Sequence, residues 1–206
     1  NIMKSKRRIG IMGGTFNPIH IGHLILAQKA YEEYELDEII FITSGDPPHK
    51  QVGHISATMR GDMTRLAVED NPIFQYSDME IKREGYSYTY LTLLELREIY
   101  ADAELYFLLG ADSLFYLEKW KRPDIIMQNA VILAANRNTN NEQLYNKIDE
   151  LKKDYDADIR IIDMPNIDIS SSSIRHMVNI GRSVKYYVPD SVIDYIKENN
   201  LYLDGE

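Results

Sequence analysis

The chain has 206 residues, of which 44% are hydrophobic and 27% are charged, a composition typical of a globular protein with one sizeable core. Its formal net charge of −9 argues against a protein that binds nucleic acid through a broad basic face, and the absence of cysteine excludes disulfides and thiolate metal sites. No segment has the apolar run of a membrane span, so we expect no membrane partner and a cytoplasmic location.

We expect one domain over residues 1–206, because no change in composition marks a linker. Residues 1–6 are expected to be a lead that is flexible or foreign to the natural protein, and residues 184–206 a helical tail.

Residues 7–30 predict a strand, a glycine turn and a helix in immediate succession. The apolar residues at 9–12 are typical of a buried parallel strand. Gly13 and Gly14 follow, and two residues without Cβ atoms allow a sharp turn and a close approach of a ligand to the backbone. A glycine pair taken alone is more simply a turn without further function.

The helix that follows is expected to begin at about Ile21 and to leave its first backbone N–H groups unpaired, which favours an anion at that end. His20 and His23 are three residues apart, so both would lie on one side of the first turn. Imidazoles at that place can hold phosphate oxygens. The simpler alternatives are a surface histidine pair or half of a metal site.

Residues 38–43 predict a second buried strand, and residues 44–55 predict a long loop that contains His49 and Lys50. These two side chains could reach a phosphate from the loop, or they could simply be solvated. Ser56 is a candidate cap for a helix that continues to about residue 67.

Residues 73–76 predict a short third strand, and an amphipathic helix follows over residues 91–100. Ser87 or Thr89 is the expected cap of that helix. The same helix start could also present N–H groups to a ligand carboxylate.

Residues 105–109 predict a fourth strand that ends in Gly110 and Asp112. Asp112 could cap the next helix or accept hydrogen bonds from ribose hydroxyls. Tyr116 and Trp120 follow at helical spacing. Such an aromatic pair is more often core, but a flat ring is also what an electron-poor pyridinium would stack on.

Residues 131–135 and 159–162 predict two more strands, and four serines at 170–173 precede an apolar-periodic helix that includes Ile174 and Arg175. The serines could be only an oversupplied cap. Hydroxyls, backbone amides and an arginine at a helix start, however, also describe a second anion site.

Strands that alternate with helices along the whole chain predict an α/β fold, a doubly wound parallel sheet with helices on both faces. No serine–histidine–acid order, carboxylate pair or metal cluster stands out, so covalent or hydrolytic chemistry has no obvious nucleophile. The reaction class that remains is phosphoryl-group transfer, which a protein can catalyse by positioning the reactants and neutralising their charge. His20, His23 and Arg175 are the candidate catalytic residues, and we expect Mg²⁺ to arrive with ATP rather than to be bound by protein ligands.

The segments GGTFNPIHIGH, PPHK, SYTYLTL, LGADS, ISSSSIR and YYVPD occur in that order over nearly the whole chain. In these segments the chain resembles the nucleotidyltransferases that share the His-x-Gly-His motif and, among them, the bacterial nicotinate mononucleotide adenylyltransferases. The resemblance implies a Rossmann-like nucleotidyltransferase fold. It also implies transfer of the adenylyl group of ATP to nicotinate mononucleotide, giving deamido-NAD and pyrophosphate in NAD biosynthesis.

By that resemblance the ATP-binding residues are Gly13, Gly14, Thr15, Phe16, His20, His23, Ser171, Ser172, Ile174 and Arg175. The residues that would bind the acceptor nucleotide are Thr15, His49, Lys50, Thr89, Gly110, Asp112, Tyr116 and Trp120. The expected partners are ATP and nicotinate mononucleotide, with no nucleic acid, and a homo-oligomer stays possible.

Three alternative functions differ from this reaction in the substrate or ligand. A sibling adenylyltransferase would use the same residues with phosphopantetheine or nicotinamide mononucleotide as acceptor. A class I aminoacyl-tRNA synthetase also has His-Ile-Gly-His, but this acidic chain has no lysine-rich second signature. A nucleotide-sensing module would bind ATP without turnover, which would not demand His20, His23 and Arg175 together.

Overall fold

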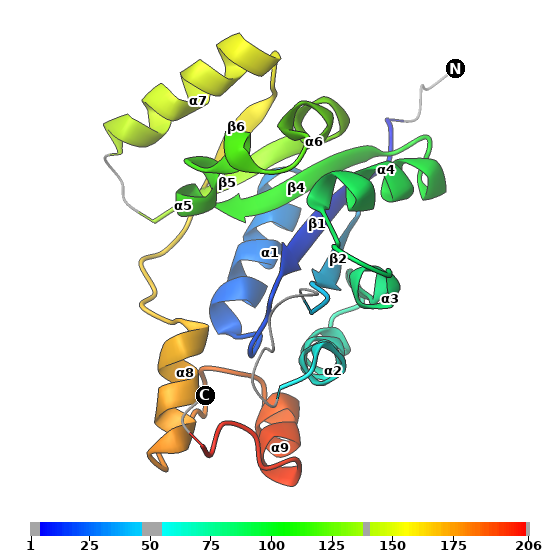
Figure 1. Cartoon of the computed structure of the whole chain (residues 1–206). Helices are drawn as coiled ribbons and strands as arrows, with labels where there is room; N and C mark the ends of the chain where they lie inside the picture. The colour runs from blue at the N-terminus through cyan, green and yellow to red at the C-terminus, as the bar shows by residue number, and fades with distance from the viewer. Residues whose placement is uncertain (1–4, 47–54, 138–140, 205–206) are drawn as a thin grey trace. The chain divides into compact units, whose positions relative to one another are not determined.

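The computed structural model describes residues 5–46, 55–137 and 141–204, which form an α/β fold around a six-stranded sheet (Figure 1). The strands lie in the order β3-β2-β1-β4-β5-β6, and the pairs β1–β4, β4–β5 and β5–β6 are parallel. Their bounds are β1 Arg8–Gly14, β2 Glu38–Thr43, β3 Phe74–Ser77, β4 Glu104–Gly110, β5 Val131–Asn136 and β6 Ile159–Asp163. This order is that of a doubly wound sheet, with its reversal between β1 and β4, and it confirms the predicted fold class.

Helices connect the strands in the described parts of the chain. Their bounds are α1 Ile21–Glu33, α2 Ala57–Val68, α3 Met79–Lys82, α4 Thr89–Ile99, α5 Ala111–Leu114, the 3₁₀ helix η1 Leu117–Lys119, α6 Pro123–Asn129, α7 Glu142–Tyr155, α8 Ser171–Asn179 and α9 Asp190–Glu198. Within these residues no helix is long and apolar enough to cross a membrane.

The chain divides into two compact units, each made of segments that are distant in sequence. Unit 1 contains residues 1–12, 27–40 and 88–166, and unit 2 contains residues 13–26, 41–87 and 167–206. The prediction of one domain over residues 1–206 therefore stays a prediction, and each unit is described by itself below.

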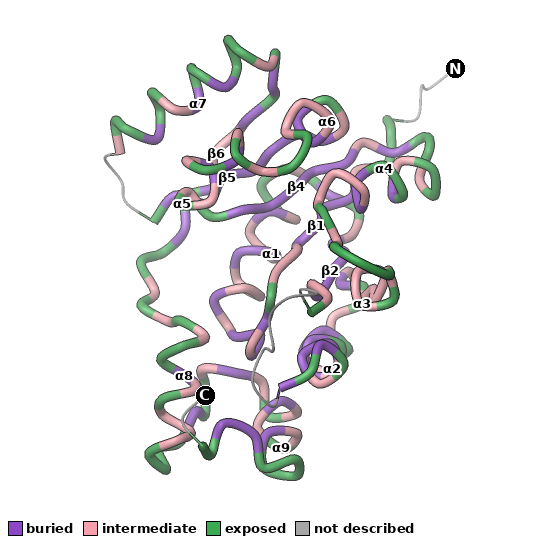
Figure 2. The backbone as a smooth tube through the Cα atoms, in the orientation of Figure 1, coloured by how far each residue is buried: buried purple, intermediate pink, exposed green. Residues whose placement is uncertain are grey.

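The core of unit 1 lies along β4 and β5, whose residues are buried almost without interruption (Figure 2). A strand between two parallel neighbours is covered on both faces, so it requires a continuous apolar run rather than alternation. The register places Met12 of β1 opposite Leu108, and Leu108 opposite Leu133 of β5. The strand predictions at residues 105–109 and 131–135 are confirmed to within one residue at each end.

The helix caps were predicted with mixed success. Ser56 caps α2, because its hydroxyl accepts a hydrogen bond from the N–H of Met59 at 3.2 Å. The cap predicted at Ser87 or Thr89 is wrong: Tyr88 stands at the N-cap position of α4, without a capping side-chain bond. Ser87 instead accepts a hydrogen bond from Arg83 at 2.7 Å, and Thr89 is already the first helical residue.

Candidate active site

The two predicted anion sites meet in unit 2 through direct hydrogen bonds. We call residues 14–20 the β1–α1 turn. Nη1 of Arg175 donates to the carbonyl oxygen of Asn17 at 2.8 Å, and the hydroxyl of Ser171 donates to that of Pro18 at 2.8 Å. The start of α8 is therefore held against the β1–α1 turn, although the two are more than 150 residues apart in sequence.

His20 and His23 form a stacked pair, with ring centroids 3.7 Å apart and planes inclined by 25°. Nδ1 of His20 accepts a hydrogen bond from the N–H of Gly22, and Nδ1 of His23 accepts one from the N–H of His20, both at 3.1 Å. A nitrogen that accepts from a backbone amide carries no proton, so each neutral ring has its proton on Nε2. The backbone thus selects the tautomer in which Nε2 is the donor.

The expectation of unpaired amides at the start of α1 is wrong. The N–H of Ile21 donates to the carbonyl oxygen of Tyr187 at 2.8 Å, and that of Gly22 donates to His20. The N–H of His23 donates to the carbonyl oxygen of His20 at 3.1 Å. Since these amides already have protein acceptors, an anion near α1 depends on the histidine rings and on the turn rather than on the first helical turn.

Two glycines of the motif lie close to aromatic rings. A Cβ atom on Gly22 would lie 2.9 Å from Cε1 of His20, because the ring of His20 folds back over this residue. A Cβ atom on Gly14 would lie 3.1 Å from the ring of Phe16. The glycines thus leave room for the neighbouring aromatic rings.

Phe16 adopts a left-handed backbone conformation with φ of 49°, which is unfavourable for a residue with a large side chain. Its ring is buried and meets the ring of His23 edge to face at a centroid distance of 5.0 Å, with Phe41 on another side at 6.1 Å. Burial of the Phe16 ring offsets the backbone strain, and the contact of this ring with His23 supports the imidazole.

The serine run at α8 caps the helix and also reaches the turn. Ser170 is the N-cap and forms a reciprocal capping box with Ser173. Ser171 is the residue that bonds to the β1–α1 turn, whereas Ser172 is exposed. Ile174 is fully buried and anchors the helix. The interpretation of the serines as helix caps is therefore right for Ser170 and Ser173. It is incomplete for Ser171, which bonds to the β1–α1 turn.

The predicted acceptor residues of unit 1 lie at element ends. Gly110 ends β4 and stands at the N-cap position of α5. Asp112 is therefore not a cap; it is exposed in the first turn of α5. Thr89 begins α4. The structure thus leaves the ligand-binding alternative for Asp112 and removes the capping one.

Tyr116 and Trp120 do not share an α-helix, contrary to the prediction from their spacing. They flank the 3₁₀ helix η1, which has a tighter turn. Tyr116 is 58% exposed, with the ammonium of Lys119 5.5 Å from its ring centroid. Trp120 is partly exposed and packs edge to face on the buried Phe107 at 6.2 Å. Neither ring is simply core.

Some predicted residues cannot be compared with the structure. His49 and Lys50 lie outside the described residues. Thr15 is described and is exposed in the β1–α1 turn. Across residues 5–46, 55–137 and 141–204, no group of three or more His, Cys, Asp or Glu side chains could hold a metal ion.

Comparisons with known proteins match the chain over almost its whole length. The model of the cytidylyltransferase-like family matches residues 11–177. The probable nicotinate-nucleotide adenylyltransferase of Lachnoclostridium phytofermentans is 48% identical over 199 residues, which is 96% of this chain and 100% of that protein. The corresponding protein of Carboxydothermus hydrogenoformans is 41% identical over 95% of this chain and 98% of its own length. The chain belongs to the nicotinate-nucleotide adenylyltransferase family.

Solved structures share the fold of this family member. Nicotinic acid mononucleotide adenylyltransferase of Plasmodium falciparum, described as complexed with NaAD, superposes with a TM-score of 0.75. The two chains are 21% identical, and the match covers 95% of this chain and 97% of that one.

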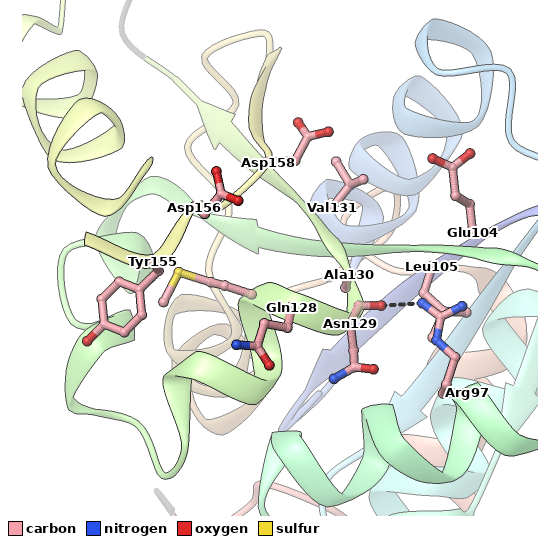
Figure 3. A pocket seen from close by; sticks show the side chains of 11 residues that line it. Arg97, Glu104, Leu105, Gln128, Asn129, Ala130, Val131, Tyr155, Asp156 and Asp158 are labelled. Carbon is pink, nitrogen blue, oxygen red and sulfur yellow. Dashed lines mark hydrogen bonds between the residues drawn. The ribbon is translucent and has the colours of Figure 1, made fainter. Parts of the chain in front are cut away.

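The pocket in Figure 3 lies in unit 1. It has a volume of about 420 Å³ and is lined by residues at the starts of β4 and β5, such as Leu105 and Val131, with Asp158 just before β6. Gly110 and Asn136 end the same two strands at their opposite ends. None of the described residues that we predicted for the site lines this pocket.

Two residues of this adenylyltransferase family member contact the β1–α1 turn but were missed by the sequence analysis. Nη1 of Arg60 donates to the carbonyl oxygen of Thr15 at 2.6 Å, and the hydroxyl of Tyr202 donates to Oδ1 of Asn17 at 2.6 Å. Arg60 precedes three buried residues of α2 at helical spacing, Met63, Thr64 and Ala67. An arginine on the buried stripe of an amphipathic helix was the signal that could have identified it. Tyr202 has no comparable signal.

Proposed function

We propose that this protein transfers the adenylyl group of ATP to nicotinate mononucleotide, giving nicotinic acid adenine dinucleotide and pyrophosphate. The observation that carries the proposal is the meeting of His20, His23 and the start of α8 at one turn, in a family named for this reaction. The proposed role is a step in NAD biosynthesis.

The reaction needs no protein nucleophile. A phosphate monoester oxygen of nicotinate mononucleotide is ionised near neutral pH and attacks the α-phosphorus of ATP. A new P–O bond forms, and the bond from the α-phosphorus to the oxygen that bridges to the β-phosphorus breaks. Pyrophosphate leaves with that electron pair. The protein is left to place the two phosphates and to neutralise charge.

The geometry of unit 2 supports the residue roles that we propose. We assign the Nε2–H groups of His20 and His23 to the oxygens of the triphosphate, where negative charge increases during the reaction. Arg175 supplies fixed positive charge for the departing phosphates, since a guanidinium stays charged at every physiological pH. Nη1 of this guanidinium already donates to the carbonyl oxygen of Asn17, and this bond restricts the orientation of the group before the ligand arrives.

The acceptor site is assigned to Thr89, Gly110, Asp112, Tyr116 and Trp120, with Thr15, His49 and Lys50. A partly exposed indole and an exposed phenol at the two ends of η1 suit stacking on a pyridinium ring. Mg²⁺ is proposed to enter with ATP and to screen the phosphate charge. A cytoplasmic location and a homo-oligomer remain predictions.

Pyrophosphate release tests the proposal. The protein is incubated with ATP and Mg²⁺, together with nicotinate mononucleotide, nicotinamide mononucleotide or phosphopantetheine in separate reactions. We expect the largest kcat/KM with nicotinate mononucleotide. Release with phosphopantetheine alone would assign the protein to the sibling reaction, and ATP binding without release from any acceptor would make it a nucleotide sensor.

A further inference from the structure

Arg60 is an arginine in an unusual setting. Its side chain is only 1% exposed, and its partner Asp46 accepts from Nη2 at 3.1 Å while remaining 44% exposed. Nη1 bonds to the carbonyl oxygen of Thr15, and Nε is buried without a hydrogen-bond partner in the structure. A buried charge with an unsatisfied donor costs stability, so Arg60 is a poor choice if its task is only to join α2 to the turn.

The bond from Arg60 fixes the direction of a peptide plane. The peptide that joins Thr15 to Phe16 is trans, since the cis bond of this region is that between Asn17 and Pro18. In a trans peptide the C=O and the following N–H point in opposite directions. With its oxygen bound by the buried guanidinium, the peptide directs the N–H of Phe16 away from Arg60.

Other carbonyl oxygens of the turn are bound as well. That of Gly14 accepts from the N–H of Ser44 at 2.9 Å, and that of Pro18 accepts from the hydroxyl of Ser171. Arg60 is the member of this set that is both charged and almost completely buried.

We propose that Arg60 is a positioning residue for ATP. It aims the N–H of Phe16 at the phosphate chain without contact with the ligand. This inference rests on the proposed function, because it takes the β1–α1 turn to be the place where the triphosphate binds. Oδ2 of Asp46 also accepts from the N–H of Ala57 at 3.1 Å, so the partner carboxylate is itself fixed at the start of α2.

Arg60→Met tests the proposal, because methionine keeps the apolar stem and removes the charge and the donors. The control is Arg65→Met, on the same helix, whose arginine is 46% exposed and pairs with Glu69. We expect Arg60→Met to lower kcat/KM for ATP about 30-fold and to change KM for nicotinate mononucleotide less than threefold. Arg60→Lys should recover part of the loss, and the control should stay within twofold of the original protein.

Calorimetric binding of inorganic tripolyphosphate separates this inference from the proposed function. Weaker binding by Arg60→Met, at least tenfold, supports the positioning role even if the original protein forms no dinucleotide. A folded Arg60→Met protein with binding and kcat/KM within twofold of the original would overturn it. If circular dichroism shows that the methionine variant is unfolded, Arg60→Gln is measured against the same limits.

Discussion

The β1–α1 turn and the two aromatic residues that flank η1 are assigned to different substrates of the proposed reaction, and they are built differently. Carbonyl oxygens of the turn are bound by Arg60, Ser171 and Arg175, whose distances in sequence from their acceptors run from 45 to 158 residues. Tyr116 and Trp120 have ring contacts with Lys119 and Phe107, close in the sequence, and Tyr116 is largely exposed.

This difference indicates that the groups held in place before the ligand binds are concentrated at the β1–α1 turn. Charge changes most at the phosphates, and fixed donors stabilise that change only if they need not reorganise during the reaction. A ring platform for a pyridinium contributes mainly to binding, where a side chain can adjust as the ligand arrives. We therefore expect changes at the turn to lower kcat and changes near η1 to raise KM.

His20→Ala is expected to give the largest effect. Loss of one preorganised donor to a developing charge typically lowers kcat by about 100- to 1,000-fold. KM for nicotinate mononucleotide should change less than threefold. Steady-state kinetics with both substrates varied will measure this. Equal losses in kcat and in acceptor binding would mean that the histidine only positions substrate, and the contrast between the two regions would fail.

Gly22→Ala should give a smaller loss of the same kind. The new Cβ would lie 2.9 Å from Cε1 of His20, so the ring must rotate or shift by a few tenths of an ångström. Since small misplacement of a catalytic group is costly, we expect kcat to fall about tenfold or more with little change in thermal stability. Kinetics and a melting curve on the same sample will show this. Unchanged kcat would mean that the exact position of the ring is unimportant.

Trp120→Ala tests the aromatic residues that flank η1. An aromatic contact contributes about 0.5 to 1.5 kcal/mol beyond burial, so KM for nicotinate mononucleotide should rise about three- to tenfold. The kcat value should stay within about threefold. Phe107 loses an edge-to-face neighbour, so melting must be checked in parallel. An unchanged KM in a folded variant would remove the stacking role.

The smallest effect concerns support for unit 2 from α9. The hydroxyl of Tyr195 donates to Asp62 of α2 at 2.9 Å, and burial followed by this bond raises the pKa of Tyr195 to about 12. A raised pKa means that the neutral phenol is favoured in the folded state. Its contribution is therefore complete below the ordinary tyrosine pKa, near pH 10, and is lost as the pH rises through about 12.

Urea unfolding of the original protein and of Tyr195→Phe at several pH values will measure this contribution. We expect Tyr195→Phe to be less stable by about 1 kcal/mol at pH 8, and the difference to close as the pH rises through about 12. The comparison with Tyr195→Phe isolates this residue from the other tyrosines that titrate in the same range. A difference independent of pH would contradict the assignment.

The sheet could be predicted because each of its strands has a local signal. The apolar runs of β2, β4 and β5 are continuous, and breaks with Gly, Pro or Asn follow them, so their bounds were found almost to the residue. The 3₁₀ helix at Leu117–Lys119 was missed, because a four-residue spacing reads as one α-helical turn whether or not the backbone tightens.

The site could be predicted only in its local parts. The sequence indicated His20, His23, Arg175 and the serines, since each lies next to a glycine turn or a helix start. It did not indicate that amides of α1 are already bonded, because their acceptors include Tyr187, far along the chain. Arg60 and Tyr202 were missed for the same reason, since their importance depends on contacts 45 and 185 residues away in sequence.

The bond from Tyr202 to Asn17 has a consequence for the order of synthesis. On a ribosome the motif that contains Asn17 emerges early, but the phenol that holds its side chain emerges more than 180 residues later. Strands β1, β2 and β4 can therefore pair while the turn still lacks its late partners. A nascent chain would acquire a sheet well before it acquires a fully supported nucleotide turn.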